Sequence, residues 1–156
     1  MNDQLYLLVV YVHILAAIAW VGGAFFLNLL GTRVSRSSDP EELPRLGRHI
    51  AWFGMRYFLP VSILTFAAGV VLTASRWSFS QAWISLAMLL WLVSLLLGAL
   101  YIGPRSQKVA EMFEAEGATS PAARAASARL TMMARIDVVI FLVIVGLMVW
   151  KPGTGG

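Results

Sequence analysis

The sequence predicts an all-α fold, a four-transmembrane-helix bundle with the N and C termini both on the outer, non-cytoplasmic side. Of the 156 residues, 59% are hydrophobic and only 13% are charged. Four apolar stretches, at about residues 5–30, 53–74, 82–103 and 130–150, each approach the ~20 residues that a membrane-spanning helix needs. These stretches use most of the chain, so residues 1–156 are expected to form a single integral membrane domain.

The first stretch, residues 5–30, is expected to be a retained membrane helix and not a signal peptide. The residues before it include Asp3 and no Lys or Arg, whereas a signal peptide begins with positive charge. Its apolar run is also longer than the ~7–15 residues of a signal-peptide core. On a 3.6-residue period, one face of this helix carries His13 together with mostly small residues: Ala16, Ala17, Trp20, Gly23, Ala24 and Leu27.

This face of the first helix has two interpretations, and the sequence leaves both open. Small residues let membrane helices pack closely, so the face could be a packing seam in which His13 hydrogen-bonds another helix. Small residues also leave room for a flat porphyrin, so the face could instead be a site in which the imidazole of His13 ligates haem iron. Met88 on the third stretch lies at a matching depth and could be the opposite ligand. His49 lies ~25 Å deeper than His13 at 1.5 Å per helical residue, too far for this role.

The second and fourth stretches contain Arg56 and Asp137, whose charges are costly in a bilayer unless they face protein. Measured from the outer helix ends they lie ~27 Å and ~20 Å deep, a difference that an arginine side chain can largely cover. We therefore predict a buried ion pair between Arg56 and Asp137. Its role is either structural or functional, as a proton path or an anion site for a carboxylate such as a porphyrin propionate. Pro60 is expected to kink the second helix. Pro104 is expected to end the third apolar span, and residues 108–113 to extend the third helix into the cytoplasm.

The distribution of Lys and Arg predicts the orientation in the membrane. Two of these residues, Arg76 and Lys151, lie on the side of the termini, and eight follow the first and third stretches, at positions 33, 36, 45, 48, 105, 108, 124 and 129. Loops rich in Lys and Arg face the cytoplasm, which predicts a multi-pass protein of the bacterial inner membrane with external termini. The net charge of +4 fits contact with anionic lipid, so we expect the lipid bilayer as a partner and no nucleic acid.

Short motifs add a resemblance to known families. The pattern H-x6-W-x-G-G beginning at His13, with Pro60 and the closing segments at residues 135–137 and 148–152, resembles small bacterial membrane proteins of the copper-resistance-D-like (CopD) superfamily. It is more distantly similar to HemJ-type protoporphyrinogen IX oxidases. The second resemblance implies that His13 ligates the iron of haem b and that Trp20 lines the same pocket. HemJ-type chains continue into an L-P-R-L-like stretch, whereas this chain reads FFLNLL at residues 25–30, which argues against oxidase activity.

Two main functions follow from these observations. The first is a haem-b-binding redox protein, in which His13, Trp20, Met88 and Arg56 form the cofactor site. The second is a non-enzymatic membrane protein, an accessory subunit or a component of metal handling or transport, with no bound cofactor. A small proton-coupled transporter is a third. The chain has no cysteine, which excludes thiolate chemistry, and no nucleophile–base pair assigns an enzyme class. Small residues on the first helix and at 67–69 would also suit a homodimer, although they equally suit packing within one bundle.

Overall fold

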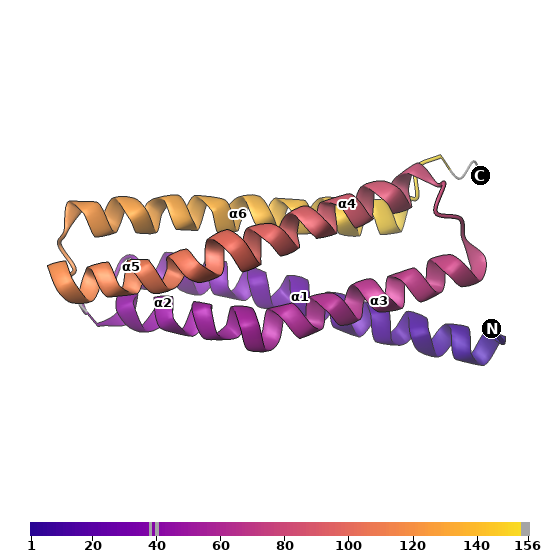
Figure 1. The fold of residues 1–156 in the computed structure, drawn as a ribbon, viewed down its shortest axis with the longest axis horizontal. Helices are drawn as coiled ribbons and strands as arrows, with labels where there is room; N and C mark the ends of the chain where they lie inside the picture. The colour runs from indigo at the N-terminus through magenta and orange to yellow at the C-terminus, as the bar shows by residue number, and fades with distance from the viewer. Residues whose placement is uncertain (38, 40, 154–156) are drawn as a thin grey trace.

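The computed structural model describes residues 1–37, 39 and 41–153, and within these residues every regular element is a helix. Four long helical rods lie side by side, each apolar and long enough to cross a membrane: Asp3–Val34, Glu42–Arg76, Ala82–Glu116 and Pro121–Trp150 (Figure 1). The predicted all-α class and the four spans are therefore confirmed. Both chain termini lie at one end of the bundle, called here the terminus end, and the opposite end is called the loop end.

The rods are longer than the apolar stretches predicted from the sequence, because helical turns that carry charged residues extend the second, third and fourth rods at the loop end. The first rod is α1 (Asp3–Val34) and the fourth is α6 (Pro121–Trp150). The second consists of α2 (Glu42–Phe53), the π-helical η1 (Gly54–Phe58) and α3 (Leu59–Arg76). The third consists of α4 (Ala82–Leu96), the π-helical η2 (Leu97–Ile102) and α5 (Gly103–Glu116). Each of these two rods thus crosses the bundle without a break.

The two π-helical stretches share one local cause. Each ends just before a proline, and the residue that precedes the proline donates its N–H to a glycine carbonyl five residues back: Leu59 to Gly54, and Gly103 to Gly98. A proline has no N–H and its ring crowds the carbonyl four residues earlier, and the wider π turn accommodates both defects. The predicted extension of the third helix beyond its apolar span is confirmed, since the rod continues through Pro104 to Glu116.

Contacts between the rods define a bundle that is tight in places and open in others. The helix α1 packs along α3 and also contacts α6, while α4 packs mainly on α6. The second and third rods meet closely at the loop end, where α2 packs on α5, and they diverge toward the terminus end (Figure 1). A Cβ atom on Gly47 of α2 would lie only 2.7 Å from the carbonyl oxygen of Ser106 on α5, so this close approach requires glycine.

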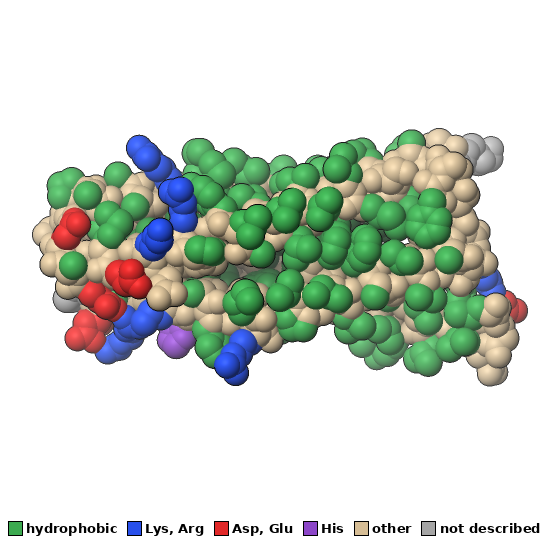
Figure 2. Space-filling model, in the orientation of Figure 1, with side chains coloured by type: hydrophobic (Ala, Val, Ile, Leu, Met, Phe, Trp, Pro, Cys, Tyr) green, Lys and Arg blue, Asp and Glu red, His purple; other side chains and the backbone are tan. Residues whose placement is uncertain are grey.

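The outer surface is that of a lipid-exposed protein. Large apolar side chains are exposed along the rods, among them Leu7, Ile18, Phe26 and Leu100, which is 73% exposed. Figure 2 shows hydrophobic side chains along the middle of the bundle and most of the visible charged side chains at the loop end. In water such a surface would be unfavourable, whereas in lipid it needs no covering. The fold thus implies a bilayer environment.

Candidate functional site

His13 lies in a seam between α1 and α3, in the half of the bundle nearer the termini. Its Nδ1 atom is 2.8 Å from the carbonyl oxygen of Thr65, so the imidazole N–H donates to the backbone of α3. The ring also fits against Gly69, where a Cβ atom would come within 3.2 Å of its Cε1 atom. The sequence interpretation of His13 as a hydrogen-bond donor to another helix therefore matches the structure. This bond leaves Nε2 as the nitrogen with a free lone pair.

The small residues near His13 are used for packing within the bundle. A Cβ atom on Gly23 would lie 3.1 Å from the ring of Tyr57, and the Tyr57 hydroxyl donates to the Ala19 carbonyl at 3.0 Å. Ala68, one of the residues on which a homodimer was predicted, is 7% exposed. Because these small faces already pack against neighbouring helices, they give no specific support to a homodimer, which stays a prediction.

A cavity of about 420 Å³ lies between the rods and reaches from the middle of the bundle toward the loop end. Residues from all four rods line it, and Figure 2 shows the front face hollowed between the second and third rods. Most of the lining is apolar or aromatic, including Trp20 of α1, Phe58 of η1 and Phe141 of α6. The rings of Trp20 and Phe141 are in contact, with centroids 4.5 Å apart. The cavity therefore has walls suited to an apolar or aromatic molecule.

Several polar side chains lie together along the part of this cavity nearest the middle of the bundle. Asp137 of α6 is only 9% exposed, and its carboxyl group lies beside the Ser94 side chain of α4, which lines the same cavity. Asn28 of α1 donates to the carbonyls of Ala24, at 3.1 Å, and Ala134, at 3.4 Å, which places its amide one helical turn from Asp137. One oxygen of each group, Oδ1 of Asp137 and Oδ1 of Asn28, has no hydrogen-bond partner among the described residues.

Unpartnered oxygens of this kind are unusual in a protein interior. Buried polar atoms normally have a partner, because leaving one without costs free energy, and the cost is greater where water is scarce. Ionisable residues within a membrane bundle commonly face a cavity in which they act on a ligand or an ion. The Asp137–Asn28 pair of acceptors, with the surrounding cavity, is therefore the candidate functional site.

Comparison with known proteins identifies the family. A family described as predicted integral membrane protein (DUF2269) matches residues 7–152. The chain belongs to this family. No curated protein and no solved structure matches it. Membership supports a multi-pass integral membrane protein, and the resemblance of this DUF2269 protein to the copper-resistance-D-like superfamily and to HemJ-type oxidases stays a prediction.

The predicted ion pair between Arg56 and Asp137 is not present in this DUF2269 protein. Among the described residues, ion pairs join Asp3 to Arg76, Glu41 to Arg45, and Arg48 to Glu114, and none joins Arg56 to Asp137. The guanidinium of Arg56 lies on the exposed surface, 5.8 Å from the centroid of the Trp52 ring. The physical reason is the orientation of this face of the second rod, since Trp52, Arg56 and Pro60 are all exposed, whereas Asp137 is buried on α6.

The other residues of the predicted haem site are also not brought together. Trp20 lines the central cavity and His13 does not, so they do not share this pocket. Met88 is carried by α4, which packs mainly on α6, whereas the imidazole of His13 is held against α3. Arg56 lines a separate surface groove. The arrangement therefore does not fit a haem bound by all four residues.

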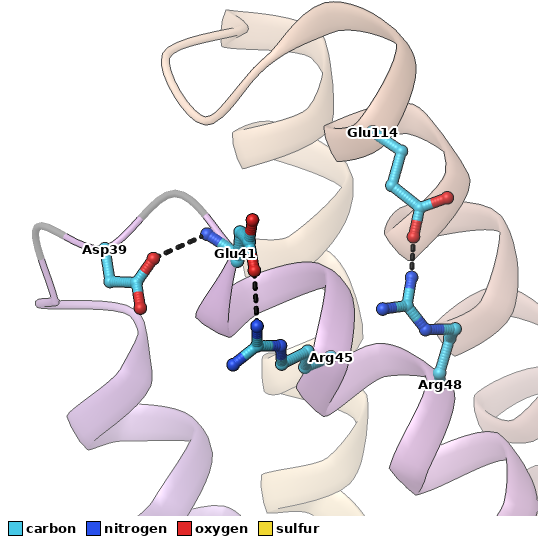
Figure 3. Close-up of polar contacts among 5 residues, drawn as sticks. All are labelled: Asp39, Glu41, Arg45, Arg48 and Glu114. Carbon is cyan, nitrogen blue, oxygen red and sulfur yellow. Dashed lines mark hydrogen bonds and ion pairs between the residues drawn. The ribbon is translucent and has the colours of Figure 1, made fainter.

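The surface groove beside Arg56 has a different electrostatic character. Its volume is about 490 Å³, and it lies between the second rod and α5. Its charged groups are mixed in sign and largely paired: Arg48 contacts Glu114, and the Gln107 amide donates to Glu111 at 3.1 Å. Figure 3 shows Arg48 reaching from α2 to Glu114 on α5, close to the start of α2, where Glu41 pairs with Arg45. The ion pair within the groove thus links α2 to α5.

Sequence reasoning selected Asp137 but missed its surroundings. Asn28 and Ser94 were not singled out, although an amide and a hydroxyl inside apolar stretches are a recognisable signal for helix contacts or cavities in a membrane. Among the described residues, no three His, Cys, Asp or Glu side chains lie close enough to hold a metal ion together. The site is therefore a lone acid with uncharged polar neighbours.

Proposed function

We propose that this protein is a non-enzymatic, transport-related membrane protein that binds a small amphipathic molecule in the central cavity. The observation that carries the proposal is the cavity, with its apolar walls from all four rods and its polar group at Asp137 and Asn28. Binding sites for small molecules are typically concavities of ~300–1,000 Å³ with mostly apolar linings and a few polar groups. The positive charge of the connecting loops favours a cytoplasmic loop end and a place in the bacterial inner membrane.

The experiment is a binding titration of the full chain in lipid nanodiscs with N-phenyl-1-naphthylamine, an uncharged probe that fluoresces in apolar surroundings. Empty nanodiscs give the background. We expect saturable fluorescence with the parent protein and loss of most of it in Ala99→Trp and Ala134→Phe, which fill the cavity. Ala82→Trp is the control, because Ala82 is exposed at the start of α4 and does not line the cavity.

Two outcomes would overturn the proposal. The parent could give no saturable signal above empty nanodiscs, or the cavity-filling variants could bind as well as Ala82→Trp. Each variant is first checked by size-exclusion chromatography, so that loss of folding is not counted as loss of binding.

Haem b on His13 is a second candidate, and one observation favours it. The bond from Nδ1 to the Thr65 carbonyl fixes the ring and leaves Nε2 free, which is how histidine ligands of metals are commonly oriented. A visible spectrum of protein from haem-replete cells, beside His13→Ala, tests this. A Soret band that is lost in the variant supports haem on the first helix. A protein that stays colourless after addition of hemin removes this candidate.

A further inference from the structure

We infer that the ligand of the central cavity is an organic cation of amphipathic shape, bound through an ammonium group at Asp137 and Asn28. The inference rests on the proposed function, since it names the chemical class of the molecule that the cavity takes. Its basis is the charge of the lining: of the described residues that line the cavity, Asp137 alone is acidic and none is basic.

The hydrogen-bonding capacity of the site points to a donor. The unpartnered buried atoms on the described residues that line the cavity are Oδ1 of Asp137 and Oδ1 of Asn28, and both are acceptors. The Trp91 indole N–H donates to the hydroxyl of Ser62, another lining residue, at 3.0 Å. An ammonium group supplies up to three N–H donors and the positive charge that an isolated acid lacks, so its chemistry is complementary to that of the two acceptors.

The walls fit the rest of such a molecule. The contacting rings of Trp20 and Phe141 and the ring of Phe58 border the same cavity as Asp137. Aromatic faces attract cations, and the attraction increases when the cation is removed from water. The aliphatic residues toward the loop end, such as Leu27, Leu43 and Leu130, give an apolar environment for a hydrocarbon tail.

Other ligand classes fit less well. A carboxylate or phosphate would meet the negative charge of Asp137 with no arginine or lysine among the described lining residues to offset it. A bare Ca²⁺ takes ~6–8 oxygen ligands, often from several carboxylates, and the cavity offers one carboxylate. A neutral hydrocarbon would fit the walls but leave both oxygens without a donor.

The experiment displaces the uncharged naphthylamine probe from the full chain in nanodiscs with three molecules of equal chain length: octylammonium, octanol and octanoate. A hydrogen bond to a charged group contributes enough that we expect octylammonium to displace the probe at a concentration at least about tenfold below that of octanol. Octanoate is expected to be the weakest. In Asp137→Asn the preference for octylammonium should fall to within about twofold. In Glu42→Gln, which removes the same charge outside the cavity, it should persist.

Asn28→Ala is a second variant that keeps the test valid if Asp137→Asn fails to fold. We expect it to retain probe binding and to reduce the preference for octylammonium part of the way. Equal displacement by octylammonium and octanol in the parent, or a preference that survives Asp137→Asn and Asn28→Ala, would overturn the inference while leaving the proposed function intact. Failure of the parent to bind the uncharged probe would instead overturn the proposed function.

Discussion

The half of the bundle near the termini and the half near the loops are held together differently. Near the termini, contacts link successive turns of α1 to the second rod: Asp3 pairs with Arg76, the Trp77 indole donates to the Tyr6 hydroxyl at 3.4 Å, and His13 donates to Thr65. Toward the loops, the rods surround a cavity with unpartnered oxygens, and the close contact is between α2 and α5.

This difference shows how a small membrane protein separates stability from binding. Lipid tails are as apolar as the side chains, so helices in a bilayer are held by close packing and polar contacts and not by apolar burial. The terminus half uses such contacts along the α1–α3 seam. In the loop half, the close contacts lie between α2 and α5 at the end of the bundle, so the middle of the bundle is free to form a cavity.

The largest expected effect comes from breaking the loop-half contact. Gly47→Leu places a side chain where even a Cβ atom would be 2.7 Å from the Ser106 carbonyl, so α2 and α5 must separate. We expect a loss of stability of about 3 kcal/mol, typical of severe overpacking, measured by thermal unfolding in detergent. Gly22→Leu is the control, because nothing lies within 4 Å of a Cβ atom there. Equal stability of the two variants would show that α2–α5 packing does not hold the loop half.

A smaller effect is expected from breaking the terminus-half seam at its centre. His13→Ala removes the bond to Thr65 and leaves a void beside Gly69. We expect a loss of about 2 kcal/mol, combining the lost hydrogen bond with the void. His49→Ala is the matched control, since His49 is exposed on α2, and its change should stay within about 0.5 kcal/mol. If the two variants unfold alike, the α1–α3 seam does not depend on the imidazole.

The smallest effect tests the missing ion pair. Arg56→Gln should change stability by less than about 0.5 kcal/mol, because the guanidinium is exposed and contacts only the Trp52 ring among the interactions described. Arg48→Gln, which breaks the exposed pair with Glu114, should cost at most about 1 kcal/mol. A loss of ~3 kcal/mol or more in Arg56→Gln would mean that Arg56 does pair with a buried acid such as Asp137.

The sequence was sufficient to predict the helical class and the four spans, and to offer a hydrogen bond from His13 to another helix as one of two interpretations. These predictions depend on apolar length and on residues within one helix. The sequence did not reveal the π-helical turns. Their signal is a repeated pattern, G-x-x-Y-x-x-P, at residues 54–60 and 98–104.

The cavity could not be predicted for a related reason. Each lining residue is ordinary on its own helix, and only the relative placement of four rods brings Asn28, Ser94 and Asp137 together. Distances measured along single helices gave depth but not direction around the helix axis. The similar depths of Arg56 and Asp137 were therefore compatible with an ion pair, although the two side chains point in different directions.

The close contact at Gly47 has a mechanical consequence, because it lies at one end of two rods that diverge from it. The contact fixes the point about which the angle between the two rods would change. Ser62, which lines the cavity, lies fifteen residues farther along the second rod, a distance of ~22 Å at 1.5 Å per residue. A change of ~5° in the angle at this contact would move that position by ~2 Å, more than the length of a carbon–carbon bond. The width of the cavity between the second and third rods at its middle thus depends on the packing of Gly47 against Ser106 at its loop end.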